Sequence, residues 1–203
     1  MTELFKIYDD FYGTDSKDYM GIIRIYEDNI LILDNKSSFI DKKDFEEFLL
    51  LLAQYVISLE NIGKYSKTIK YAEKTLQLID SKIVEYKINL SDYTTYWSIM
   101  VSKGRAHYNL KEYNNAIQIF ERLLTRDPEN DNLKNWLVAS RSNKRNSINK
   151  YLYISAVVFF LVSVMPSFKE NGSFFIKFGF LLLITGLINE YFGDKIFQWM
   201  KEE

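Results

Sequence analysis

The chain has 203 residues, of which 26% are charged and 16% aromatic, and its net charge is −1. This composition excludes a disordered chain, and the near-zero net charge argues against a strongly basic nucleic-acid binder. The absence of cysteine excludes a disulfide scaffold and a thiolate metal site, and a single histidine, His107, excludes a multi-histidine metal centre. Only two prolines interrupt the sequence, so the composition predicts an all-α protein.

Opposite charges gather in different parts of the chain. Residues 1–60 carry 13 acidic and 6 basic residues, a net of −7, whereas residues 61–150 carry 9 and 16, a net of +7. The charged side chains either form solvent-exposed helix faces or steer a partner by electrostatic attraction. The basic part can also attract anionic lipid. The N-terminus lacks a basic segment followed by an apolar run, so we expect neither a signal peptide nor a transit peptide.

Three segments of the polar part align without gaps, over residues 19–34, 65–80 and 113–128. Each begins with tyrosine, has isoleucine four residues later and has glutamate eight residues later (Tyr19, Ile23, Glu27; Tyr65, Ile69, Glu73; Tyr113, Ile117, Glu121). This spacing predicts an amphipathic helix in each segment. For residues 22–33 the β-rich composition leaves a β-hairpin open as an alternative.

Each of these segments follows another stretch with helical periodicity, over residues 2–12, 42–61 and 92–110. Short breaks with glycine or asparagine separate the two members of each pair. We therefore expect three helix-turn-helix units, with a degenerate first pair in residues 1–41 and two clearer pairs in residues 42–130.

The last unit has Gly104, Tyr113, Ala116, Phe120 and Pro128 at the spacing of small, aromatic and proline positions in a known helical repeat. By these residues it resembles a tetratricopeptide repeat, whereas the middle unit matches less well. The matched tyrosines are 46 and 48 residues apart, against a family period of about 34. The resemblance implies an array of paired helices with irregular steps.

The resemblance also implies a concave face, made by the first helix of each pair, that binds a protein or peptide. By residue-for-residue match, the partner-binding residues on that face are Gln54, Ser58, Asn61, Ser102, Arg105 and Tyr108. The lysines and asparagines with which some relatives clamp a terminal carboxylate are missing, so a carboxylate-clamp co-chaperone is not expected.

A final helix starting at residue 131 is expected to cap the array, because a terminal repeat cannot bury its apolar face alone. Residues 131–150 also form a basic juxtamembrane segment with Arg141, Lys144, Arg145 and Lys150, and we expect membrane lipid to bind there. Nucleic acid is not expected as a partner.

The C-terminal part, residues 151–193, predicts a two-span transmembrane hairpin with spans at about 151–168 and 174–192. A buried core hairpin is the alternative. Bases before the first span and in residues 194–203 place both termini in the cytoplasm under the positive-inside rule, with 194–203 as an amphipathic cytoplasmic tail. Gly179, Gly186 and Gly193 recur every seven residues and predict a stripe for close helix packing.

Together these features predict a tetratricopeptide-like array followed by a membrane hairpin, in an integral protein of a bacterial inner membrane. No catalytic or cofactor motif is present, so we expect a non-enzymatic, cofactor-free adaptor or scaffold for an unidentified protein or peptide. The alternatives are a non-catalytic subunit of a membrane enzyme or transporter complex, and a membrane signalling module.

Overall fold

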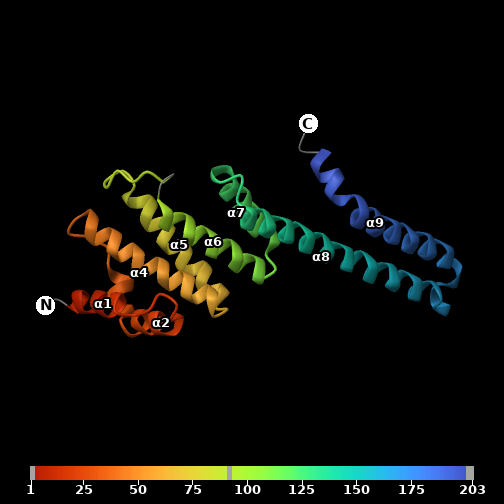
Figure 1. Ribbon diagram of the computed structural model, residues 1–203. Coiled ribbons are helices and arrows are strands. Elements are labelled where there is room, and N and C mark those ends of the chain that lie inside the picture. Colours follow the sequence, from red (N-terminus) through yellow and green to blue (C-terminus); the bar gives the residue numbers. More distant parts are fainter. Residues whose placement is uncertain (1–2, 91–92, 200–203) are drawn as a thin grey trace. The chain divides into compact units, whose positions relative to one another are not determined.

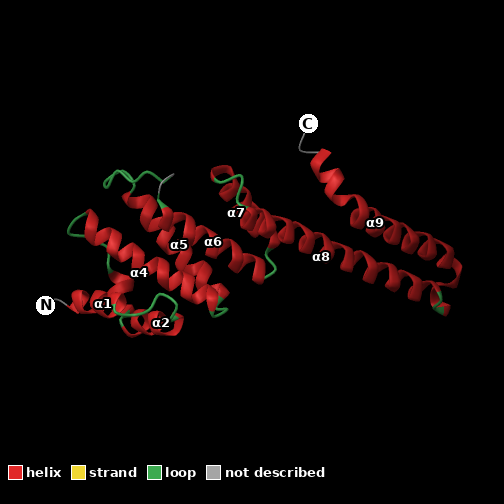
Figure 2. Ribbon diagram, in the orientation of Figure 1, coloured by secondary structure: helices red, strands yellow, loops and turns green. Residues whose placement is uncertain are grey.

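A computed structural model describes residues 3–90 and 93–199, and within these ranges every regular element is a helix (Figure 2). The predicted all-α class is therefore confirmed for this part of the chain. The chain divides into two compact units, Met1–Leu137 and Val138–Glu203. The first unit contains the predicted helix pairs and the second contains the apolar C-terminal helices (Figure 1).

The first unit begins with three short helices, α1 (Glu3–Tyr12), α2 (Tyr19–Asp28) and α3 (Ile30–Asn35). The β-hairpin alternative for residues 22–33 is wrong, because this segment forms α2 and α3. The Asp18 side chain starts α2 by accepting a hydrogen bond from the Gly21 backbone N–H. The predicted helix over 19–34 is interrupted at Asn29, whose side chain donates back to the Ile25 carbonyl.

Four longer helices follow in the first unit, α4 (Lys42–Asn61), α5 (Tyr65–Lys82), α6 (Thr94–Asn109) and α7 (Tyr113–Arg126). Their bounds lie within about two residues of the expected ones, since each is amphipathic and flanked by a turn signal. Consecutive helices pack on each other, and α4 also contacts α2 and α6. The arrangement is thus repeat-like, with each pair packed against its neighbours.

The turns inside the two clear pairs are built alike. Gly63 has a φ of +77° and Lys111 a φ of +64°, and these residues stand at matched positions 48 residues apart. In each turn the next residue's backbone N–H bonds to a carbonyl five residues back, from Lys64 to Leu59 and from Glu112 to His107, at 2.9 Å in both. This is the Schellman pattern of a left-handed helix end.

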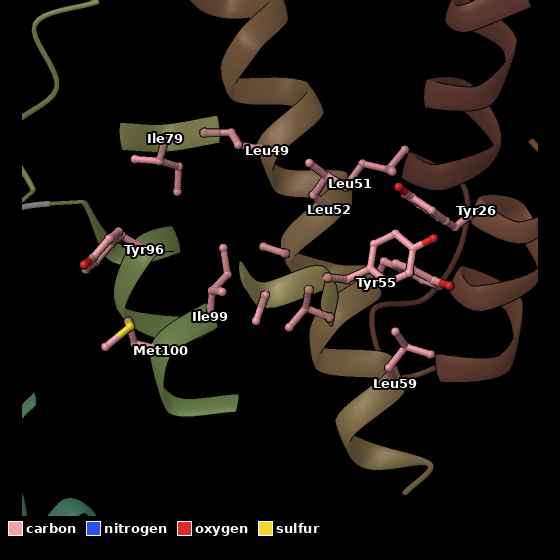
Figure 3. Close-up of a cluster of buried hydrophobic side chains, with 14 of the residues drawn as sticks. Tyr26, Leu49, Leu51, Leu52, Tyr55, Leu59, Ile79, Tyr96, Ile99 and Met100 are labelled. Carbon is pink, nitrogen blue, oxygen red and sulfur yellow. The ribbon is translucent and has the colours of Figure 1, made fainter. Parts of the chain in front are cut away.

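The core of the first unit surrounds α4, which supplies buried side chains in several directions (Figure 3). Figure 3 shows Tyr55 of α4 beside Tyr26 of α2, and their rings stack with centroids 3.8 Å apart. On another side of α4, Leu49 lies near Ile79 of α5, and both side chains are fully buried (Figure 3). A helix buried on several sides carries apolar residues around much of its circumference, as α4 does.

Close packing between α6 and α7 depends on small residues. Gly104 of α6 is buried, and a Cβ placed there would lie 3.0 Å from side-chain atoms of both Ile119 and Phe120 on α7. Ala116 of α7 is fully buried. The two small residues that the sequence analysis singled out therefore lie where the two helices are close.

Helix α8 (Asp131–Ser163) runs without interruption from the predicted cap into the apolar segment. Its first turns belong to the first unit, where Leu133 and Leu137 join the core. The rest of α8 forms the second unit with a 3₁₀ helix, η1 (Pro166–Asn171), and with α9 (Gly172–Trp199).

The second unit is an antiparallel pair of helices. Phe159 of α8 packs on Phe178 of α9, and Phe160 packs on Phe180, with ring centroids 4.8 and 5.3 Å apart. The glycine stripe of α9 faces α8, because a Cβ at Gly179 or at Gly186 would meet the ring of Phe160 or Tyr153. The stripe thus packs against α8 within the same chain, and aromatic rings fill the space beside it.

The prediction of two membrane spans needs correction. Among the described residues one helical segment, Gly172–Gly193, is long and apolar enough to cross a membrane, and it includes the expected second span. The expected first span, 151–168, is not one helix, since α8 ends at Ser163 and η1 begins at Pro166. Its helical part, 151–163, extends about 20 Å, which is short of a hydrocarbon core of about 30 Å.

Within the expected tail, residues 200–203 and the side chains of 194–199 lie outside the described part of the chain, and the predicted amphipathic character of 194–203 is left as a prediction.

Candidate partner-binding face

Helices α4 and α6 pack against each other and bring together some of the six residues expected to bind a partner. Ser58 and Ser102 are buried, with 0% and 3% of their surfaces exposed, so they do not present a surface to a partner. Asn61 is exposed at the end of α4, and its side chain bonds back to the Ile57 carbonyl at 2.8 Å. Gln54 is half-buried in the middle of α4.

Arg105 is the centre of the part that remains accessible. Its guanidinium lies over the ring of Trp136, 5.4 Å from the centroid, and Nη1 lies 3.8 Å from Glu60 Oε2. Its Nε is buried and has no hydrogen-bond partner among the described residues. A guanidinium offers five N–H groups in a planar fork, so this one is held in place by stacking while part of its donor capacity is unused.

Aromatic rings surround this guanidinium. Tyr108 meets Trp136 edge-on at 5.1 Å and Tyr113 at 5.8 Å, and Trp136 stacks on Phe120 at 6.0 Å. Trp136 belongs to the first turns of α8, the expected cap. Trp136 was not expected at the site, because nothing in the local sequence pattern tells which ring an arginine on another helix will contact. The one indication in the sequence was that Trp136 lies in the helix expected to pack on the last repeat as its cap.

The charge of Glu60 is poorly compensated at this face. Burial raises the pKa of the Glu60 carboxyl, and the nearby Arg105 lowers it by less, so the net direction is upward. The effect of burial on this pKa exceeds that of Arg105 because the two groups are 3.8 Å apart, and an ion pair at that distance without a hydrogen bond does not offset the loss of hydration. Arg105 and Glu60 therefore form a loose pair rather than a closed one.

No model of a protein family, no curated protein and no solved structure matches this chain. The arguments about function consequently rest on the geometry of the chain itself.

The histidine of α6 is part of a turn in the structure. His107 is buried, with 6% of its surface exposed, and its Nδ1 lies 2.5 Å from Glu112 Oε2. Glu112 stands directly before α7, so this contact joins the end of α6 to the start of the next helix. A buried histidine with one carboxylate partner in a helix turn has a structural role.

A polar network that was not expected from the sequence joins α3 to α2 and α5. Asp34 Oδ1 accepts a hydrogen bond from Tyr26 at 2.7 Å, and Asp34 Oδ2 accepts one from Tyr71 at 3.1 Å. Lys74 Nζ lies 2.9 Å from Asp34 Oδ1 and also donates to the Asp34 backbone carbonyl. No spacing rule pairs residues 37 and 40 positions apart, so the network could not be expected from periodicity.

The network changes the acid–base behaviour of its members. Burial raises the pKa of the Asp34 carboxyl, but the hydrogen bonds from Tyr26 and Lys74 more than offset it, and the pKa is lowered. Burial and the adjacent Asp34 charge raise the pKa of Tyr71 to about 12. The ionised carboxylate is thus stabilised by donors, and we interpret the cluster as a structural clasp for the first helix pair.

Proposed function

We propose that this chain is a membrane-anchored helical-repeat scaffold, in which the second unit enters the bilayer and the first unit binds a protein or peptide. The observation that carries the anchor is the apolar surface of the second unit. Large apolar side chains on both helices are 38–73% exposed (among them Ile154, Val157, Leu161, Leu181, Ile184 and Leu187). Monomeric soluble proteins rarely expose an apolar surface of this extent.

The ends of the apolar part also support the anchor. Tyr151 on α8 and Tyr191 on α9 are 71% and 73% exposed, and both stand where the apolar stretches end. Tyrosine favours the membrane–water interface. Arg141, Lys144 and Lys150 lie in the turns of α8 before Tyr151, which favours the cytoplasmic side for this end.

The scaffold part is supported by the matched turns at Gly63 and Lys111 and by the tight contact at Gly104, which are features of paired-helix repeats. For the partner we propose a peptide segment with a carboxylate that reaches Arg105. The Arg105 side chain is 36% exposed and is only loosely paired with Glu60 at 3.8 Å, and Tyr108 and Trp136 provide aromatic surface beside it. Arginine and aromatic residues are frequent at the centres of interfaces.

Membrane fractionation of the full chain tests the anchor. The protein should stay in the membrane pellet after washes with high salt and alkaline carbonate. Lysine at both Leu181 and Ile184 should release it, since each lysine at mid-membrane costs about 2.5–3.5 kcal/mol. The matched control places lysine at Leu31 and Val84, two apolar residues of the first unit that are 78% and 85% exposed. Release of the parent by salt, or equal behaviour of both variants, would contradict the anchor.

Capture of partners from native membranes tests the binding face. Arg105→Ala combined with Tyr108→Ala should lower capture at least tenfold, because truncation of central interface residues costs about 2 kcal/mol or more. Arg24→Ala is the matched control, since Arg24 is an exposed arginine on α2. Circular dichroism should show an unchanged fold in both. Undiminished capture by the double variant would refute this face.

A further inference from the structure

Two polar contacts join α8 and α9 at the same end of the second unit. Asn189 donates from Nδ2 to Asn149 Oδ1 at 2.5 Å, and the Tyr153 hydroxyl donates to Glu190 Oε2 at 2.7 Å. Asn149 is 4% exposed. Polar groups between helices in an apolar setting are held by such contacts, so these residues fix the spacing of the two helices at this end.

A shallow cavity of about 360 Å³ lies beside these contacts, lined by Asn146, Asn149, Lys150, Tyr153, Ile154 and Glu190. Asn146, Lys150 and Tyr153 are three or four residues apart, so they share one face of α8. Glu190 reaches the cavity from α9. The cavity thus presents one ammonium group, one carboxylate and side-chain amides, and neither Lys150 nor Glu190 forms an ion pair within the described residues.

The cavity lies where the apolar stretches of α8 and α9 end, and this position restricts the kind of ligand that it can meet. Lys150 directly precedes the apolar stretch of α8, and Glu190 directly follows the apolar stretch of α9. The exposed Tyr151 and Tyr191 stand next to them. If the second unit is embedded as proposed above, the cavity lies at the depth of the lipid headgroups.

We propose that this cavity binds the headgroup of a phospholipid that carries both a phosphate and a primary amine, as phosphatidylethanolamine does. Lys150 and the Asn146 amide donate to the phosphate, and the carboxylate of Glu190 accepts from the ammonium group. The Tyr153 hydroxyl holds the carboxylate in position through one oxygen. This inference rests on the proposed membrane anchor.

The same chemistry disfavours the other common headgroups. An anionic headgroup without an amine would bring its charge close to Glu190, which repels it. A choline headgroup has no N–H to donate to the carboxylate. The cavity should therefore distinguish a primary amine from a quaternary one, which is a preference that hydrophobic anchoring alone does not produce.

Native mass spectrometry of the full chain in mild detergent tests the proposal, with short-chain phosphatidylethanolamine, phosphatidylcholine and phosphatidylglycerol as probes. The ethanolamine lipid should bind roughly tenfold more tightly than the other two, the effect of about one charge-assisted hydrogen bond. Glu190→Gln keeps an acceptor for Tyr153 but removes the charge, and it should abolish the preference for ethanolamine over choline. Lys150→Met should weaken binding of all three lipids, whereas Lys144→Met, a basic residue of the same helix outside the cavity, should not.

Equal binding of the ethanolamine and choline lipids by the parent would overturn the proposal, as would a preference that survives in Glu190→Gln or a preference for phosphatidylglycerol. Free phosphoethanolamine that competes at the lipid's own concentration would exclude a lipid as the ligand. These failures differ from failure of the anchor, because carbonate-resistant membrane association of the parent is measured separately.

Discussion

At Gly104, where α6 packs closely on α7, a substitution to alanine has two opposing effects on stability. Replacing Gly104 by alanine in the interior of α6 should gain about 1 kcal/mol from helix propensity alone. The new Cβ would lie 3.0 Å from atoms of Ile119 and Phe120, and overpacking of a core typically costs about 1–3 kcal/mol. We therefore expect Gly104→Ala to lower the free energy of unfolding by up to about 2 kcal/mol.

A double-mutant cycle separates the two energies. Phe120→Leu should cost about 1–2 kcal/mol, less than the roughly 3–5 kcal/mol of a phenylalanine-to-alanine change, and it should make room beside residue 104. The double variant should then be about 1 kcal/mol more stable than the sum of the single effects predicts. Urea denaturation of the full chain in mild detergent, followed by circular dichroism, gives the four free energies.

A control measures the propensity gain where packing does not interfere. Ser98 lies on α6, and its hydroxyl donates to the Thr94 carbonyl of the same helix. Comparing glycine with alanine at position 98 should show the full gain of about 1 kcal/mol. If Gly104→Ala stabilises the protein by that same amount, and if the cycle is additive within about 0.5 kcal/mol, the close approach of α6 to α7 is refuted.

Three further predictions concern the turn, the clasp and the membrane. Lys111→Gly should raise the free energy of unfolding by about 1 kcal/mol, because Lys111 has a left-handed backbone, whereas Gly63→Ala should lower it; equal effects of both on thermal unfolding would contradict the matched turns. Because the pKa of Asp34 is lowered on folding, its contribution is present above the unfolded pKa of about 4 and is lost as the pH falls through the folded value. Asp34→Asn should therefore be less stable at pH 7 and lose less stability on acidification than the parent, and parallel curves of melting temperature against pH would exclude this role. If both antiparallel helices of the second unit enter the bilayer, reporters fused to the two termini should lie on the same side of the membrane, whereas crossing by Gly172–Gly193 alone would place them on opposite sides and would refute insertion as a hairpin.

The sequence by itself was sufficient to predict the helical class and the bounds of α4 to α7. Those helices have apolar residues at regular spacing, and their ends carry local signals such as Asn61, Gly63 and Asn109. Their boundaries depend on interactions within a few residues, which a single sequence contains. The same holds for the apolar character of residues 151–193, since hydrophobicity is a property of composition and length.

Other features were decided only by tertiary structure. The contacts of Arg105 with Trp136, and of Asp34 with Tyr26, Tyr71 and Lys74, connect residues on different helices at irregular separations. The burial of Ser58 and Ser102 likewise depends on how closely α4 and α6 approach. The interruption between Ser163 and Pro166 divides a stretch that its composition alone describes as one span. Composition indicates how strongly a segment favours an apolar environment. Only the folded chain determines which atoms surround that segment and where each helix ends.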